Sequence, residues 1–358
     1  MINCNRKILL LISALLFSGI SYLTYKSIVK SSNSSVLSPV TSINYQDCTT
    51  MIPPIVNGYG SPGIHSVSRE TFPSPLWRVN QVHVYYPSSV DYPVPVIFFA
   101  HAYGVIYPKL YDALIQHIVS QGYALVYAPY KGNIPHRERY QMLWSGFESA
   151  VKNYPEKFDL DRIGFMGHSY GGGAIPALAY QGLVQKQWGK QGAFLFIMAP
   201  YYSFEINYEQ LQHLPPQTKL LLQVYEEDRV NDHRIAINLF NQFTLSPDRK
   251  NYVMIRSDKN LNCRLVADHE TPLSSGLPRK KIVVNGLDYY GVYRLFDALA
   301  DYTFYGSLNG KSVALGRQND QQTYMGSWPN GVEVKRLIST RVPQPIQDRN
   351  FYRYSLRD

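Results

Sequence analysis

A serine between two glycines, in the segment Gly167-His168-Ser169-Tyr170-Gly171, is the strongest chemical signal in this chain of 358 residues. The short apolar run of residues 162–166 precedes it, and the following segment, GGGAIPALA, has helical character. A serine at such a strand–turn–helix junction has a strained backbone, and the glycines let crossing chain segments approach closely. Its hydroxyl stands above the carboxyl end of the sheet, at the positive end of a helix. We therefore predict that Ser169 is a nucleophile.

The elements that must position this serine follow a regular alternation. Short apolar runs typical of buried strands alternate with amphipathic segments of helical spacing, which predicts βαβ units. The fold class is therefore α/β, with a mostly parallel central sheet and helices on both faces. We expect strands at residues 79–86, 95–100, 123–128, 162–166, 193–198, 220–225 and 251–256, and helices at 108–120, 137–153, 172–183, 232–243 and 289–305.

The order of these elements, together with the serine turn, resembles the α/β-hydrolase superfamily and in particular its serine esterases and lipases. The resemblance covers roughly residues 65–306 and is closest to small enzymes of dienelactone-hydrolase-like, chlorophyllase-like or polyester-hydrolase-like type. It implies an α/β-hydrolase fold and the hydrolysis of carboxylic esters through an acyl-enzyme, without a cofactor. Only residues 199–219 separate two strands at the usual position of a cap. We therefore expect little or no lid, and an open cleft for small-molecule or polymer esters.

The resemblance also implies where the catalytic partners lie, because the family order is serine, acid, histidine. Asp228 stands in the loop after the strand at residues 220–225, where the family carries its acid, and Asp232 is the alternative. A solvated helix entry with Asp232 as its N-cap is the competing interpretation of this acidic loop. His269 follows the last predicted strand and is the expected general base. His168 is expected to pack, because neighbouring side chains diverge on a tight turn.

Two backbone N–H groups are the expected oxyanion donors. His101-Ala102-Tyr103-Gly104 follows the strand at residues 95–100, where the family places its first donor, and Tyr170 follows the nucleophile. The resemblance thus assigns this role to the amides of Tyr103 and Tyr170. Preorganised amides of this kind contribute about 3 kcal/mol each to an acyl-transfer transition state.

Two other functions remain open at this point. An envelope acyltransferase would use the same three residues, with an alcohol in place of water. A catalytically silent hydrolase fold that serves as a binding module is the alternative from another class. A metal site is not expected, since the Asp and His pairs near residues 232–233 and 268–269 lack a recognisable ligand spacing.

The N-terminal residues indicate a compartment outside the cytoplasm. Basic Arg6 and Lys7 precede the uncharged stretch at residues 8–25, which is typical of a signal peptide or a membrane anchor. We divide the chain into this segment (1–30), a linker (31–63), the α/β-hydrolase catalytic domain (64–306) and a C-terminal extension (307–358) with one possible strand at 332–337. The protein is expected to be secreted or periplasmic, with possible membrane association through residues 8–25.

Charge and cysteine content add two expectations. Lys and Arg number 35 against 26 Asp and Glu, a formal charge of +9, but no basic cluster is dense enough to predict a nucleic-acid partner. Cys48 and Cys263 both lie after the apolar stretch. In an oxidising compartment they can form a disulfide, although two unpaired thiols remain the alternative.

Overall fold

The computed structural model describes residues 52–275 and 282–356. The predicted signal or anchor at residues 8–25 and the cysteine at position 48 lie outside these ranges. Within the described residues, no helix has the length and apolar character needed to cross a membrane.

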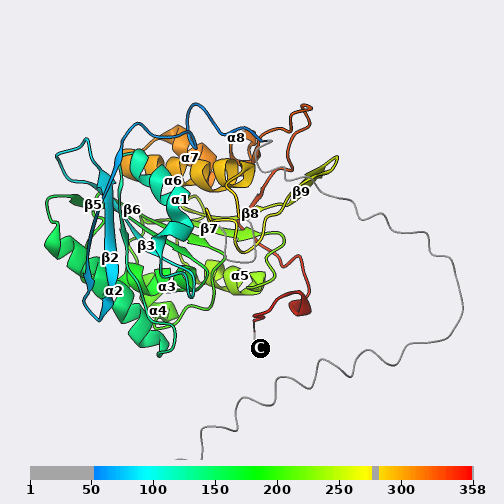
Figure 1. The fold of residues 1–358 in the computed structure, drawn as a ribbon. Coiled ribbons are helices and arrows are strands. Elements are labelled where there is room, and N and C mark those ends of the chain that lie inside the picture. Colours follow the sequence, from blue (N-terminus) through cyan, green and yellow to red (C-terminus); the bar gives the residue numbers. More distant parts are fainter. Residues whose placement is uncertain (1–51, 276–281, 357–358) are drawn as a thin grey trace, which may run out of the picture. The chain divides into compact units, whose positions relative to one another are not determined.

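Nine strands form one sheet, in the order β1-β2-β4-β3-β5-β6-β7-β8-β11 (Figure 1). The six central strands from β4 to β8 run parallel, whereas β1, β2 and β11 pair antiparallel at the two edges. The predicted α/β class with a mostly parallel sheet is confirmed. The strands are β1 (Val67–Ser74), β2 (Trp77–Pro87), β3 (Val94–Ala100), β4 (Ala124–Tyr127), β5 (Phe158–His168), β6 (Gly192–Met198), β7 (Lys219–Tyr225), β8 (Lys250–Ile255) and β11 (Ile338–Thr340), and a separate hairpin contains β9 (Asp258–Asn260) and β10 (Cys263–Leu265).

Helices cover both faces of this sheet (Figure 1). Successive side chains of a strand point to opposite faces, so Phe98 packs in one apolar cluster and Phe99 in the other. The helices are α1 (Asp112–Ser120), α2 (His136–Asn153), α3 (Tyr170–Ala179), α4 (Tyr208–Gln212), α5 (His233–Gln242), α6 (Arg294–Tyr305), α7 (Leu308–Leu315) and α8 (Asp320–Thr323). Two segments are 3₁₀ helices, η1 (Pro108–Tyr111) and η4 (Arg349–Phe351). Two are π-helices, η2 (Tyr180–Gln185) and η3 (Leu287–Tyr293). The burial of continuous apolar strands between two helical layers is the main stabilising contribution to the fold.

Some elements differ from the sequence expectations. β1 was not predicted, because it is a half-buried edge strand that contains several polar residues and no continuous apolar run. The strand expected at residues 332–337 is wrong: the chain pairs with β8 only at β11, where Ile338 opposes Met254. Strand formation depends on an available partner edge more than on intrinsic propensity. The helix expected from residue 172 begins two residues earlier, at Tyr170, directly after the nucleophile candidate.

Residues 307–356 belong to the same compact unit as the central sheet. They contribute α7, α8 and the ninth strand, and the buried side chains of Val313, Met325 and Trp328 join the apolar cluster on the α1–α6 face. Residues 52–63, at the end of the segment assigned to the linker, also contact the body, since the Gly60 N–H donates to Asp297 Oδ2 at 2.7 Å.

Candidate active site

Ser169 lies in the turn between β5 and α3, with φ 56° and ψ −119°. An L-residue rarely adopts this left-handed conformation, which costs roughly 1–3 kcal/mol and persists only where the surroundings hold it. Here three backbone hydrogen bonds do so. The Ser169 N–H donates to the Met198 carbonyl at 2.9 Å, and the Ser169 carbonyl accepts from the N–H groups of Gly173 at 3.0 Å and Tyr201 at 2.9 Å. These hydrogen bonds therefore fix the backbone that carries the Ser169 hydroxyl.

The glycines around this serine are required by close chain approach. A Cβ on Gly171 would lie 2.0 Å from the Ala100 carbonyl oxygen at the end of β3, and one on Gly167 would lie 2.6 Å from the Gly171 oxygen. Real Cβ contacts do not occur at these distances. The glycine pattern of the sequence thus follows from the crossing of β3, the turn and α3 at one point.

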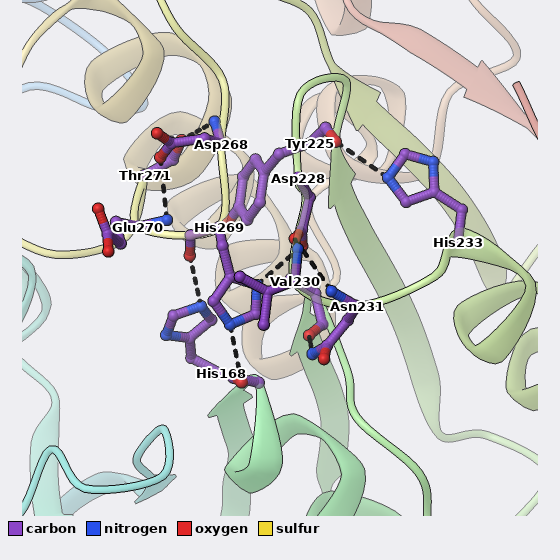
Figure 2. Close-up of polar contacts among 12 residues, drawn as sticks. His168, Tyr225, Asp228, Val230, Asn231, His233, Asp268, His269, Glu270 and Thr271 are labelled. Carbon is purple, nitrogen blue, oxygen red and sulfur yellow. Dashed lines mark hydrogen bonds and ion pairs between the residues drawn. The ribbon is translucent and has the colours of Figure 1, made fainter. Parts of the chain in front are cut away.

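The structure brings Ser169, His269 and Asp228 together. His269 Nε2 lies 2.8 Å from Ser169 Oγ, and His269 Nδ1 lies 2.8 Å from Asp228 Oδ2. Figure 2 shows the imidazole of His269 directed at the carboxylate of Asp228. The Asp228 side chain is 1% exposed and that of His269 13%, so the carboxylate is shielded while the imidazole reaches the surface. This is the geometry of a nucleophile, a base and an orienting acid.

The loop after β7 holds the Asp228 carboxylate in place. Its Oδ1 accepts hydrogen bonds from the N–H groups of Val230 at 2.7 Å and Asn231 at 3.1 Å (Figure 2). The Asn231 side chain in turn donates to the Ala199 carbonyl at 2.9 Å, at the end of β6. Because Oδ1 is occupied by backbone donors, Oδ2 is the oxygen left to face His269.

Asp232, the alternative acid, has a different place. It is the N-cap of α5, and its Oδ1 accepts from the Arg234 N–H at 2.9 Å and pairs with the Arg234 guanidinium at 3.1 Å. Its Oδ2 accepts from the Leu356 N–H at 3.3 Å. Both oxygens are thus used away from His269, in keeping with the capping interpretation of this residue.

The loop that carries His269 is a self-bonded turn. The Asp268 N–H donates to Thr271 Oγ1 at 3.0 Å, the Glu270 N–H donates to Asp268 Oδ1 at 3.0 Å, and the Thr271 N–H donates to the Asp268 carbonyl at 3.0 Å (Figure 2). These bonds restrict the backbone on both sides of the histidine. A side chain on a backbone that is held in this way has little conformational entropy left to lose when it binds or reacts.

His168 is buried, as expected, but its contacts were not predicted. Its Nε2 lies 2.8 Å from the His269 carbonyl oxygen, and its Nδ1 lies 2.8 Å from the Tyr111 hydroxyl. Burial, followed by the nearby His269, holds the pKa of His168 well below its ordinary value. No local pattern in the sequence could indicate Tyr111, which stands 57 residues earlier in η1.

Of the two expected oxyanion donors, Tyr170 directly follows the serine, and Tyr103 lies in the turn after β3, the end of which approaches Gly171. Tyr170 is the first residue of α3, so its N–H has no acceptor within the helix. Tyr103 lies in the turn after β3, where the Val105 N–H donates to the Ala102 carbonyl at 3.1 Å; no backbone carbonyl of the described residues accepts from the Tyr103 N–H. The rings of Tyr103 and Tyr170 meet edge to face with centroids 6.2 Å apart. Both amides are therefore free to bind a developing negative charge.

Aromatic side chains continue from these donors along one side of the site. The Tyr201 ring lies 6.4 Å from Tyr170 and 5.3 Å from Tyr354 of the C-terminal extension. The Tyr202 hydroxyl donates to the Ser355 carbonyl at 2.6 Å. The extension thus reaches the aromatic surroundings of the site, a role that the sequence did not indicate.

Three further observations concern other predicted groups. In the described ranges, no group of three or more His, Cys, Asp or Glu side chains is arranged to hold a metal ion. Cys263 in β10 is disulfide-bonded. Its predicted partner, Cys48, lies outside the described residues, so that pairing stays a prediction. A cavity of about 650 Å³ lies beside α1 and is lined by residues such as His117 and Tyr293, and by none of the triad.

No model of a known protein family matches the chain, and no curated protein matches its sequence. What supports a function for this protein is therefore the geometry of the site itself.

Proposed function

We propose that this protein is a serine hydrolase with an α/β-hydrolase fold, and that it cleaves carboxylic esters through an acyl-enzyme. The observation that carries the proposal is the hydrogen-bonded series Ser169–His269–Asp228, with both distances at 2.8 Å, mounted on a strained turn between a strand and a helix. The six parallel strands and the order of the three residues in the chain are consistent with this fold.

In the first half of the reaction, Ser169 Oγ attacks the ester carbonyl while His269 Nε2 accepts the hydroxyl proton. Asp228 holds the Nδ1–H tautomer and stabilises the imidazolium that forms. The N–H groups of Tyr103 and Tyr170 bind the oxyanion of the tetrahedral intermediate. His269 then gives its proton to the leaving alcohol, and the acyl group remains on Ser169.

In the second half, water replaces the alcohol. His269 takes a proton from the water molecule and the hydroxide attacks the acyl carbonyl. The second tetrahedral intermediate then collapses: His269 returns its proton to Ser169 Oγ, and the carboxylic acid leaves. Between β6 and β7 the chain forms only the five-residue helix α4. We expect so small a cap to leave the site open, which favours short acyl esters or exposed polymer esters over long-chain triglycerides.

The test uses the full-length protein and a short-chain p-nitrophenyl ester. We expect Ser169→Ala to remove at least about 10⁴-fold of kcat, because the nucleophile is lost while the oxyanion donors remain. A fluorophosphonate probe should label the wild-type protein once, at Ser169, as read by peptide mass spectrometry. Hydrolysis that persists in Ser169→Ala would contradict the proposal.

A matched control is Ser145→Ala, which removes a serine hydroxyl bonded only to the Met142 carbonyl within α2. This variant should retain wild-type turnover and labelling. An ester series of increasing chain length then tests the open cleft, for which a strong preference for long acyl chains would be the contrary result.

A further inference from the structure

His168 lies at the centre of a chain of buried hydrogen bonds that joins three loops. Its Nε2 meets the carbonyl oxygen of His269 and its Nδ1 meets the Tyr111 hydroxyl, both at 2.8 Å; the first contact is drawn in Figure 2. The same hydroxyl lies 3.1 Å from the Ala102 N–H, in the turn that carries the Tyr103 amide. His168 is 1% exposed and Tyr111 is fully buried. The chain therefore runs from the base loop, past the nucleophile, to the oxyanion turn.

The direction of each hydrogen bond follows from the chemistry of the groups. A carbonyl oxygen only accepts, so the proton of His168 must be on Nε2. Burial keeps this histidine neutral, so its Nδ1 has a lone pair and accepts from the Tyr111 hydroxyl. The Tyr111 oxygen then accepts from the Ala102 N–H. Every donor and acceptor in the chain is satisfied in one arrangement only.

A buried chain of polar groups destabilises the fold unless every group in it has a hydrogen-bond partner. A buried imidazole and a buried phenol each need a hydrogen-bond partner, because an unsatisfied polar group in an apolar interior destabilises the fold. An apolar pair would fill the same space without that risk. The contacts also span 57 and 101 residues of sequence, so they link segments that no local turn connects.

We propose that His168 and Tyr111 are positioning residues. They hold the loop of His269 and the turn that carries the Tyr103 amide in fixed positions relative to Ser169. This inference rests on the proposed function. Neither side chain has a hydrogen bond to Ser169 or to the His269 ring among the described contacts; each acts on backbone groups. The imidazole rings of His168 and His269 lie 4.9 Å apart and tilted, so His168 also limits the sideways movement of the base.

Two polar substitutions at His168 test whether a hydrogen-bond donor is needed specifically at the site of Nε2. Glutamine places its amide nitrogen close to the site of Nε2 and can still donate to the His269 carbonyl, whereas asparagine reaches only the site of Nδ1. We expect His168→Asn to lower kcat about 100-fold, since misplacement of a reacting group by about 1 Å costs that much. His168→Gln should stay within about threefold of the wild type, and KM should change little in either variant.

Tyr111→Phe removes only the hydroxyl, and the ring keeps its contact with Phe99 at 4.8 Å. We expect a fall in kcat of about tenfold, because the Ala102 N–H and His168 Nδ1 both lose their partner. The matched control is Tyr123→Phe, a buried tyrosine of the same apolar cluster that lies next to the opposite, amino end of β4. It should leave kcat unchanged. Equal loss in His168→Asn and His168→Gln, or equal kcat in Tyr111→Phe and the wild type, would overturn the inference.

A second measurement does not depend on activity. In protein labelled with ¹⁵N-histidine, the His168 ring should show the neutral Nε2–H tautomer and stay neutral as the pH is lowered through the ordinary histidine range, and Tyr111→Phe should shift its Nδ1 signal. The titratable groups that face this ring are Tyr111 and His269. An Nδ1–H tautomer, or protonation near pH 6, refutes the hydrogen-bond chain. Absence of ester turnover in the wild type instead refutes the proposed function, so the two failures are distinguishable.

Discussion

Asp228 and Asp232 have the same side chain and stand four residues apart, yet their surroundings give them different roles. Asp228 is buried, and its two oxygens are divided between backbone N–H groups and the base. Asp232 caps a helix and pairs with Arg234. At the scale of single residues, the function of a carboxylate is therefore decided by which donors its loop presents to each oxygen.

This difference leads to a paired prediction. Asp228→Asn should lower kcat about 10⁴-fold with little change in fold, because an amide favours the wrong tautomer of His269. Asp232→Asn should retain activity and lower the free energy of unfolding by roughly 1–3 kcal/mol, because asparagine is also a good N-cap but the buried carboxylate that pairs with Arg234 is lost. Steady-state kinetics and thermal unfolding measure both. The assignment of the acid would be reversed if Asp232→Asn were the inactive variant.

At the scale of elements, the C-terminal segment braces the acid loop. The N–H groups of Arg353 and Tyr354 donate to the carbonyls of Arg229 and Val230, both at 2.8 Å, and the Asp232 N–H donates to the Tyr354 carbonyl at 2.9 Å. These bonds continue the loop after β7 into a short parallel pairing beside α5 (Figure 1). The extension therefore restricts the loop that carries Asp228.

Removal of residues 349–358 should loosen this loop. We expect faster amide hydrogen exchange at Asp232, since its N–H loses the Tyr354 carbonyl, and a fall in kcat of about tenfold through misplacement of Asp228. Exchange in β5 and β6 should stay unchanged, which serves as the internal control. Wild-type exchange and turnover in the shortened chain would show that the extension does not brace the site.

At the scale of the whole molecule, the core contains a carboxyl group that affects stability without taking part in the site. Asp288 is 2% exposed, and its Oδ2 accepts from the Asn285 N–H at 2.8 Å. Burial raises the pKa of Asp288 to about 8. In the unfolded chain this pKa is about 4, so between about pH 4 and pH 8 the folded protein binds more protons than the unfolded chain. Stability from this group is present below about pH 4 and is lost as the pH rises towards 8.

Asp288→Asn should remove that dependence. Relative to the wild type, we expect the variant to gain stability as the pH is raised from 5 to 8, in urea unfolding at each pH. Asp248→Asn is the control, because the hydrogen bonds from Ser246 and Lys311 lower the pKa of Asp248 to about 2 and it is ionised throughout this range. A constant difference between Asp288→Asn and the wild type would contradict the prediction.

Much of the fold could be predicted because its signals are local. A run such as residues 193–198 is apolar at every position, so both of its faces must be covered, which a sheet between two helical layers achieves. The structure buries every residue of β6. The turn at Ser169 was equally readable, since its flanking glycines reflect steric contacts within a few residues and with β3. By contrast β1 and β11 lie at sheet edges, where one partner strand decides whether pairing occurs, and their own residues carry a weak pattern.

By itself, the sequence determined the alternation of strands and helices and the glycine-flanked serine turn, and its family resemblance implied the order of serine, acid and histidine. Only the tertiary structure decided between Asp228 and Asp232, placed Tyr111 and His168 behind the base, and brought Tyr354 to the rim of the site. The physical reason is distance along the chain. Periodicity and turn chemistry act over a few residues, whereas these contacts join segments that meet only when the sheet and both helical layers have assembled.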